Sequence, residues 1–328
     1  MTLGAEVQYD SLLFDLDGTV WEGGLLLPDA AEVINTSSLP VMYITNNASR
    51  GPDVVAEMLT KLGIPTSTDQ VLTSAQAAVE FAQQNLPPQT AVYVLGSESF
   101  KELARQGGFR VVDSADDAPQ AVLHGHNPET CWAQLSEAAL SIQRGSLYFA
   151  SNLDTTLPME RGLMIGNGSL VAAVATATGV QPTSAGKPEP AMFYSAAKKL
   201  DSTRPLAVGD RLNTDIAGGV AAGMDTFHVC TGVSQHWALL HAEAQERPTY
   251  LARGLADLRG TLDALVPQLQ HGYVAVADGE DIVLSGGDGD PMAALRSVLK
   301  LAWATSSPFT GTVRADGIAA ENALAAWN

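Results

Sequence analysis

Two carboxylates stand at the end of the first long apolar run in this sequence. Residues 11–14 are followed by Asp15, Asp17 and Gly18. Because side chains two apart on a strand point the same way, Asp15 and Asp17 would project together from the strand end. Gly18 would allow a sharp turn behind them. Such a pair can hold a hard cation such as Mg2+, or one carboxylate can attack phosphorus while the other moves a proton.

An acidic turn is the common setting of an isolated Asp-x-Asp, and a calcium-binding loop is a second alternative. An EF-hand loop that starts at Asp15 needs Gly at its sixth position and Glu at its twelfth. Those positions hold Val20 and Leu26, so the sequence excludes this calcium loop. The choice between an acidic turn and a catalytic pair therefore depends on the rest of the chain.

A second apolar strand, residues 41–45, ends in hydroxyl and amide groups. Thr45, Asn46 and Asn47 can bind phosphate oxygens together with backbone N–H groups, and they add no negative charge. The same residue types are also common in turns and helix caps. This segment alone predicts either a phosphate-binding strand end or an ordinary turn.

Two later segments add a cation and more carboxylates. Lys187 stands at the expected start of a helix that Pro188 would help to fix, although a single lysine is commonly a solvated surface charge. A third strand, residues 205–209, ends in Asp210, and Asp215 follows five residues later. Asp210 could therefore bring a further ligand to a cation.

Taken in order, these four segments resemble the signature of the haloacid-dehalogenase superfamily of aspartyl phosphotransferases, across residues 11–235. The resemblance implies that Asp15 is the nucleophile that forms a phosphoaspartate. It also implies that Asp17 protonates the leaving oxygen and later activates water. Since the dehalogenases of that family lack the second aspartate, its presence here favours a phosphatase.

The same resemblance implies which groups handle phosphate and metal. Thr45 and Asn46 would bind the transferring phosphoryl group, and Lys187 would neutralise it and orient the nucleophile. Mg2+ is the implied cofactor. Its implied ligands are the carboxylate of Asp15, the backbone carbonyl of Asp17, Asp210 and, in or just behind the metal shell, Asp215.

Charge and cysteine content limit the partners that we expect. The 328-residue chain carries a formal net charge of -18, from 18 basic and 36 acidic residues. Such a surface repels nucleic acid and anionic membranes, so we expect neither as a partner. Its 2 cysteines form neither a disulfide framework nor a zinc-ligand spacing. The first basic residue is Arg50, so the sequence starts without a secretory n-region, and we expect a cytoplasmic protein.

Strands alternate with helices along the chain, which predicts an α/β fold with parallel sheets. We expect a core from residues 1–82 and 181–267, an inserted α/β domain from residues 83–180, and an accessory segment from residues 268–328. The expected helices cover residues 52–62, 71–84, 100–106, 131–144 and 168–179.

This order of elements is similar to the type-IIA capped branch of the superfamily. The resemblance implies a Rossmann-like core with an inserted type-IIA cap that roofs the active site, and segments 150–154 and 160–163 resemble the region between cap and core. His124, His126 and Asn127 stand where the branch carries its substrate-contact loop. The alternative is that His124 is a satisfied strand residue and His126 is simply solvated.

The branch includes p-nitrophenyl phosphatase-like, pyridoxal-phosphate and glycerol-phosphate phosphatases. Overall, the chain most resembles glycerol-phosphate phosphatases of the actinobacterial type, which have an extra C-terminal segment. The resemblance implies a small phosphate ester as substrate, with glycerol 3-phosphate as the first choice. Pyridoxal phosphate, sugar phosphates and nucleotides are alternatives. A phosphomutase and a ligand sensor on a retired enzyme scaffold also stay open.

The C-terminal segment is predicted to be α+β. Residues 271–284 indicate two strands around an Asp-Gly turn, and residues 290–303 indicate an amphipathic helix with an Asp cap. The loop at residues 286–290 either binds a cation or phosphate or simply connects the two. About sixty residues form a poor independent core. We therefore expect the segment to dock on the rest of the chain or on a partner chain, and a homodimer stays open.

Overall fold

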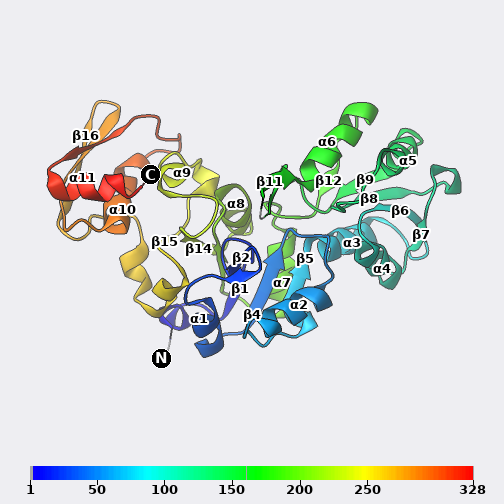
Figure 1. Cartoon of the computed structure of the whole chain (residues 1–328), viewed down its shortest axis with the longest axis horizontal. Helices are drawn as coiled ribbons and strands as arrows, with labels where there is room; N and C mark the ends of the chain where they lie inside the picture. The colour runs from blue at the N-terminus through cyan, green and yellow to red at the C-terminus, as the bar shows by residue number, and fades with distance from the viewer. Residues whose placement is uncertain (1–2, 160, 328) are drawn as a thin grey trace. The chain divides into compact units, whose positions relative to one another are not determined.

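The computed structural model describes residues 3–159 and 161–327, which form two compact units (Figure 1). Unit 1 contains residues 1–41 and 199–328, and unit 2 contains residues 42–198. Both units pack helices on parallel strands, as the alternation in the sequence predicted. Within the described residues, no helix is long and apolar enough to cross a membrane.

Unit 1 contains four parallel strands in the order β15-β14-β13-β1. Every residue of β1 and β13 is buried, which explains why both read as continuous apolar runs rather than alternating ones. The strands are β1 (Ser11–Phe14), β13 (Pro205–Gly209), β14 (Asp225–Val229) and β15 (Tyr250–Ala252). Around them lie α1 (Ala30–Thr36), α8 (Ala217–Ala221), α9 (His236–Leu240) and the small hairpin β2 (Trp21–Glu22) and β3 (Leu25–Leu26).

Unit 2 contains a five-stranded parallel sheet in the order β12-β9-β8-β6-β7. Helices α3 and α4 lie on one face of this sheet, and α5 and α6 lie on the other (Figure 1). The strands are β6 (Ala91–Leu95), β7 (Arg110–Val112), β8 (Ala121–His124), β9 (Leu147–Ala150) and β12 (Thr183–Ser184). The helices are α3 (Ser74–Asn85), α4 (Glu98–Gln106), α5 (Trp132–Gln143) and α6 (Asn167–Thr178).

The rest of unit 2 includes a parallel strand pair, two α-helices and a hairpin. These elements are β4 (Val41–Thr45), β5 (Val71–Thr73), α2 (Pro52–Lys61), α7 (Ala191–Lys199), β10 (Thr156–Met159) and β11 (Gly162–Ile165). The hairpin β10-β11 was not predicted from the sequence. It overlaps only residues 162–163 of the segments 150–154 and 160–163 that resemble the region between cap and core, and Glu160 is outside the described residues.

One expected helix begins later than predicted. Residues 71–84 were expected to be helical throughout, but the first three residues form β5, which pairs with β4. Helix α3 starts at Ser74 because Thr73 and Gln76 form a capping box, in which each side chain bonds the other residue's backbone N–H. The strand contains only three residues, so no alternation was available to distinguish it from a helix turn.

The C-terminal segment contains a three-stranded sheet and two helices. The predicted strands and helix are present as β16 (Tyr273–Asp278), β17 (Asp281–Gly286) and α10 (Pro291–Ala302), and β18 (Val313–Asp316) and α11 (Ile318–Ala325) complete the segment. Its apolar side chains share one core with residues of the preceding chain, which confirms that the segment docks there. Members of this core include Leu212, Ile216, Leu239, Leu240, Leu251, Leu295, Val298, Leu299 and Trp327.

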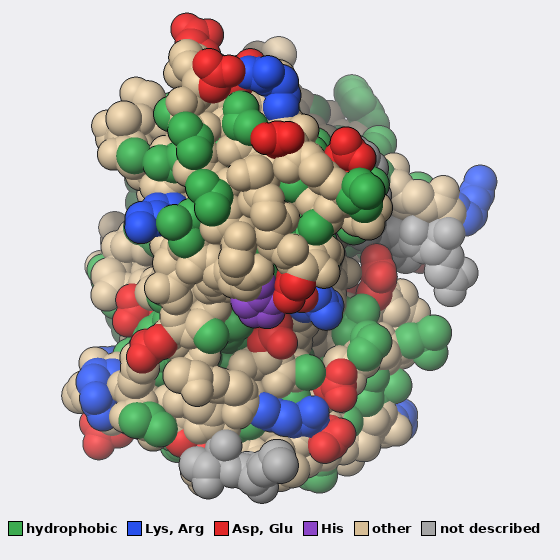
Figure 2. Space-filling model, turned by 90° about the vertical axis from the view of Figure 1, so that its left-hand side faces the viewer, with side chains coloured by type: hydrophobic (Ala, Val, Ile, Leu, Met, Phe, Trp, Pro, Cys, Tyr) green, Lys and Arg blue, Asp and Glu red, His purple; other side chains and the backbone are tan. Residues whose placement is uncertain are grey.

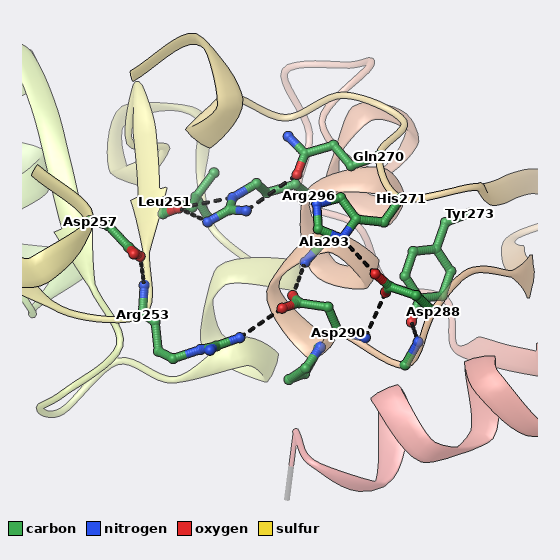
Figure 3. Close-up of polar contacts among 12 residues, drawn as sticks. Leu251, Arg253, Asp257, Gln270, His271, Tyr273, Asp288, Asp290, Ala293 and Arg296 are labelled. Atoms are coloured by element: carbon green, nitrogen blue, oxygen red, sulfur yellow. Dashed lines mark hydrogen bonds and ion pairs between the residues drawn. The ribbon is translucent and has the colours of Figure 1, made fainter. Parts of the chain in front are cut away.

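A buried arginine ties the segment to strand β15 (Figure 3). Arg296 is only 7% exposed, and its guanidinium donates to the carbonyl oxygen of Leu251 from Nε (2.9 Å) and Nη2 (2.7 Å). It also donates to the side-chain oxygen of Gln270 at 3.2 Å. Burial lowers the pKa of Arg296. Removing this side chain would leave the Leu251 carbonyl without these two donors inside the protein.

The acidic loop at residues 286–290 makes contacts that hold the C-terminal segment in place (Figure 3). Asp290 caps α10 by accepting from the N–H of Ala293 at 2.8 Å, and it pairs with Arg253 at 2.8 Å. Asp288 contacts the imidazole of His271 at 2.8 Å. These contacts favour the interpretation that the loop is a connection rather than a ligand site.

Figure 2 shows the side of the molecule that carries the C-terminal segment. Acidic and basic side chains are interspersed there with hydrophobic ones. Val274 and Val276 of β16 are among the exposed apolar residues, at 48% and 55%. A mixture of this kind is typical of ordinary protein surface, to which apolar atoms contribute more than half of the area.

The shared core predicts that the segment unfolds together with unit 1. We expect Leu295→Ala, at a position with 0% exposure, to lower the free energy of unfolding by about 2–5 kcal/mol, because it leaves a cavity. Urea unfolding followed by circular dichroism measures this change. The matched control is Leu269→Ala, at a position that is 48% exposed. If both variants lost the same small amount, α10 would not belong to the cooperative core.

Candidate active site

Three buried carboxylates meet at one end of the sheet in unit 1. One oxygen each of Asp15, Asp210 and Asp215 lies within 4.8 Å of the other two. The residues are 8%, 1% and 4% exposed. Like charges at such distances repel strongly when they are shielded from water, so the arrangement favours a bound cation. Carboxylate oxygens are the ligands that Mg2+ prefers, so the donor set fits the expected cofactor.

Strand pairing explains why residues so distant in sequence come together. Strands β1 and β13 are parallel, with Phe14 opposite Val208, and the N–H of Asp15 donates to the carbonyl oxygen of Val208 at 2.9 Å. Because parallel strands end at the same edge, Asp15 and Asp210 emerge side by side there.

Asp215 reaches this edge from a π-helical turn, η4 (Leu212–Ile216). Its carboxylate accepts from the N–H of Arg211 at 3.1 Å, which turns the side chain back toward the strand end. The side chain also lies directly against Gly209, where an added Cβ would come within 2.3 Å of the Asp215 Cβ. A π-turn of this kind is often found at functional sites.

The Asp210 carboxylate lies between two glycines. An added Cβ would approach its Oδ2 to 2.6 Å at Gly18 and to 2.0 Å at Gly232. Gly18 also has φ +94, a conformation that other residues rarely adopt. The carboxylate accepts from the N–H of Val233 at Oδ2 (2.6 Å) and from the Thr19 hydroxyl at Oδ1 (3.3 Å). Glycine is therefore required at both positions, because any larger residue would clash with the carboxylate of Asp210, a candidate metal ligand.

Asp17 is placed differently from the other three aspartates. Its side chain is exposed, and Oδ1 accepts from the indole N–H of Trp21 at 2.9 Å. It is not a member of the three-carboxylate group. The structure therefore leaves the Asp17 side chain exposed beside the Trp21 indole, outside the cluster of buried carboxylates.

Asn46 and Lys187 form a closed arrangement in unit 2. The side-chain oxygen of Asn46 accepts from the N–H of Lys187 at 2.9 Å, and its amide nitrogen donates to the Lys187 carbonyl at 3.0 Å and to Asp154 at 3.1 Å. The Lys187 side chain is 2% exposed, and its ammonium donates to the Ile44 carbonyl at 3.0 Å. Thr45 is also 2% exposed, and its hydroxyl accepts from the N–H of Asn47. The structure thus brings these three predicted residues together.

The three residues of the predicted substrate loop differ in their surroundings. His124 has 0% exposure on β8, and its Nδ1 contacts the Tyr148 hydroxyl at 2.8 Å. Burial lowers the pKa of His124 to about 3, so the ring is neutral. Asn127 holds the loop, since it accepts from the N–H of Glu129 at 3.1 Å and donates to the Gly96 carbonyl at 3.4 Å. His126 is partly buried, and burial lowers its pKa.

Sequence reasoning missed the loop at residues 231–235, whose contacts surround Asp210. In addition to the Val233 contact, the Thr231 hydroxyl donates to the Gly18 carbonyl at 2.7 Å. The signal for this loop was weak, because residues 225–229 include the polar side chains of Asp225, Thr226 and His228, and no carboxylate follows them. By contrast, the contact of Trp21 with Asp17 and that of Asp154 with Asn46 had no local signal.

Comparisons with known proteins place these features in a family. Residues 12–110 match the family model described as haloacid dehalogenase-like hydrolase, and residues 184–258 match one described as HAD-hydrolase-like. The D-glycerol 3-phosphate phosphatase of Mycobacterium tuberculosis is 40% identical over 301 residues, which cover 92% of this chain and 85% of that protein. The acid sugar phosphatase of Staphylococcus saprophyticus is 37% identical over 255 residues, which cover 76% of this chain and 96% of that protein.

A solved structure resembles the chain over its full length. It is the glycerol phosphate phosphatase of Mycobacterium tuberculosis in complex with magnesium, with a TM-score of 0.94 and 38% identity. The match covers 100% of this chain and 99% of that one. The likeness therefore covers both units, including the C-terminal segment of unit 1.

The glycine cradle around Asp210 predicts a steric effect on metal binding. We expect Gly232→Ala to weaken Mg2+ binding by at least about tenfold, because the new methyl group must displace the carboxylate or the loop. Titration calorimetry without substrate measures this. Gly260→Ala is the matched control, because its nearest atom to the added Cβ is 3.5 Å away. Unchanged Mg2+ affinity in Gly232→Ala would show that Asp210 can bind metal from another position.

Proposed function

This chain belongs to the haloacid dehalogenase-like hydrolases and is a phosphatase, and we propose that it is a Mg2+-dependent phosphomonoesterase whose main substrate is glycerol 3-phosphate. The observation that supports this substrate is the share of the chain that each relative covers. The relative named for D-glycerol 3-phosphate aligns with 92% of this chain, whereas the relative named for acid sugar phosphates aligns with 76%. The chain shares its whole architecture, C-terminal segment included, with a glycerol phosphate phosphatase.

In the proposed mechanism Asp15 attacks phosphorus and the alkoxide of the substrate leaves. Asp17 gives its proton to the leaving oxygen, and Asp15 becomes a phosphoaspartate. Asp17, now ionised, takes a proton from a water molecule that attacks the same phosphorus atom. Inorganic phosphate leaves and Asp15 is restored. The exposed side chain of Asp17 supports this role, because a proton-transfer group must meet both the substrate and water.

Charge balance is the main requirement of the reaction. A carboxylate that approaches a phosphate dianion meets strong repulsion. Mg2+, when bound by Asp15, Asp210 and Asp215, supplies positive charge that offsets this repulsion. In our proposal the ammonium of Lys187 supplies a second positive charge, and the Thr45 hydroxyl donates to a phosphoryl oxygen. Asn46 also binds the phosphoryl group, and its side chain fixes the backbone of Lys187.

We propose that His126 and Asn127 contact the substrate and that His124 supports their loop from inside the unit. The burial of His124 and its contact with Tyr148 support the division. The Asn127 side chain already bonds the backbone of Gly96 and Glu129, so His126 is the better candidate for a hydroxyl contact that discriminates one alcohol from another.

The division into domains is also a proposal. Residues 1–82 and 181–267 would form the core, residues 83–180 the cap, and residues 268–328 an accessory segment. The five-stranded sheet of unit 2, most of which comes from residues 91–150, supports a separate cap. The partner we propose is a small phosphate ester, not nucleic acid or a membrane, for a cytoplasmic protein that is either a monomer or a homodimer.

A sugar phosphate is the second candidate substrate. The acid sugar phosphatase of Staphylococcus saprophyticus aligns over 96% of its own length, at 37% identity. Because that protein is also named a phosphatase, the chemistry would be the same. The choice between the two substrates therefore depends on the loop and not on the carboxylates.

The phosphoaspartate mechanism predicts the effects of two substitutions. We expect Asp15→Asn to abolish release of inorganic phosphate from glycerol 3-phosphate, because the amide is not a nucleophile. Asp17→Asn should lower turnover by about 100- to 10,000-fold, because proton transfer is lost. Asp263→Asn, at an exposed position, is the control. Near-normal turnover in Asp15→Asn would contradict the mechanism.

Labelled water distinguishes a phosphatase from a phosphomutase. In water labelled with oxygen-18, a phosphatase incorporates the label into inorganic phosphate, whereas a phosphomutase releases no inorganic phosphate.

The loop predicts a substrate-dependent effect. We expect His126→Ala to lower kcat/KM for glycerol 3-phosphate by about tenfold, the worth of one lost hydrogen bond. The value for p-nitrophenyl phosphate should change much less, because that substrate has no hydroxyl for the loop to bind. Glu129→Ala, in the same loop and exposed, is the control. Equal losses on both substrates would assign the loop a structural role. Much faster hydrolysis of pyridoxal phosphate or a sugar phosphate by the unaltered protein would replace the substrate.

A further inference from the structure

The loop between β14 and α9, residues 231–235, holds the Asp210 carboxylate from one side. Its Val233 N–H donates to Oδ2, and the N–H of Ser234 donates to the backbone carbonyl of Asp210 at 3.2 Å. The Ser234 hydroxyl accepts from the N–H of Leu212 at 3.1 Å, where the turn that carries Asp215 begins. One short loop therefore contacts Asp210 and also the turn that carries the third carboxylate.

The strand that precedes this loop anchors it near its C-terminal end. His228 of β14 has 0% exposure, and its Nε2 contacts the Ser234 carbonyl at 2.9 Å. Burial lowers the pKa of His228 to about 4, so the ring is neutral and Nε2 carries the proton that it donates. On its C-terminal side, the loop continues directly into α9 at His236.

Helix α9 cannot hold the loop by itself. It contains 5 residues, and no side-chain hydrogen bond caps its N-terminus. A helix of this length is not stable alone, because the free-energy cost of nucleating a helix exceeds the stabilisation from the hydrogen bonds of a single turn. Its position must therefore come from the residues that pack against it.

The C-terminal segment supplies that packing. The Trp327 ring stacks on His236, with centroids 6.0 Å apart and an interplanar angle of 8°, and meets Trp237 edge-on at 5.5 Å. Trp327 is 2% exposed, and its indole N–H donates to the Pro291 carbonyl at 3.1 Å. At the other end of α9, the Trp303 indole N–H donates to the Leu239 carbonyl at 3.1 Å. Both ends of the short helix are thus fixed by tryptophans of the segment.

We propose that Trp327 is a positioning residue for the metal site: it fixes α9 and thereby the loop that orients Asp210. The proposal rests on the Mg2+-dependent function given above and assigns the C-terminal segment a part in it. His236, the first residue of α9, lies three residues after Val233, so loss of its stacking partner loosens the donor to Oδ2. Metal binding then weakens, because a carboxylate that is free to rotate loses entropy when it binds.

The test measures Mg2+ affinity on the full chain without substrate, by titration calorimetry. We expect Trp327→Ala to raise the dissociation constant about tenfold and Trp327→Phe to raise it less, because phenylalanine keeps a stacking ring. At saturating Mg2+ the kcat of Trp327→Ala should return close to that of the unaltered protein. A general loss of packing would lower kcat at every Mg2+ concentration.

Two controls separate this effect from nonspecific damage. Trp132→Ala removes the same side chain from a position that is 82% exposed, and Ile318→Ala alters a 77% exposed residue of the C-terminal segment. Both should leave the Mg2+ affinity unchanged. His236→Ala removes the partner of the stacked pair, and its effect on affinity should not add to that of Trp327→Ala, because both break one contact.

The outcomes distinguish this inference from the proposed function. A folded Trp327→Ala protein with unchanged Mg2+ affinity overturns the inference, even if glycerol 3-phosphate is hydrolysed. If Trp327→Ala does not fold, His236→Ala and Trp327→Phe decide, and unchanged affinity in both overturns it. An unaltered protein that binds Mg2+ but does not hydrolyse glycerol 3-phosphate overturns the substrate assignment and leaves the inference standing.

Discussion

The repulsion among three buried carboxylates is the constraint on which this site depends. Asp15, Asp210 and Asp215 each offer an oxygen within 4.8 Å of the others, and charges this close are costly where water is excluded. The fold compensates by donating to them from the backbone, as Val233 does to Asp210 and Arg211 does to Asp215. A cation completes the compensation, so metal binding and folding of this region are expected to be coupled.

The positions of the candidate site aspartates could be predicted from the sequence because each obeys a local rule. Asp15 and Asp210 directly follow buried parallel strands, and such strands are readable as apolar runs. The capping of α10 by Asp290 was predictable for the same reason, since the signal lies within four residues. By contrast, the three residues of β5 were assigned to a helix because so short a strand has no readable period.

Features that depend on long-range contacts could not be predicted. Nothing near Asn46 in the sequence indicates that its side chain bonds both backbone groups of Lys187 and the carboxylate of Asp154. Similarly, the enclosure of His124 depends on what covers β8, which a strand of four residues does not reveal. The apolar helix face of the C-terminal segment predicted that the segment would dock on other residues, but it did not predict the contact with α9.

The close approach of Gly18 and Gly232 to Asp210 has a consequence for protein engineering. The shape of the backbone around the carboxylates is as specific as the carboxylates themselves, so transplanting the aspartates alone onto another parallel α/β scaffold would not transfer the chemistry. Laboratory evolution of a new substrate preference is better directed at other positions. The loop around His126 can accept substitutions, because its side chains are partly exposed. The two glycines can accept very few, because any side chain there would meet the Asp210 carboxylate.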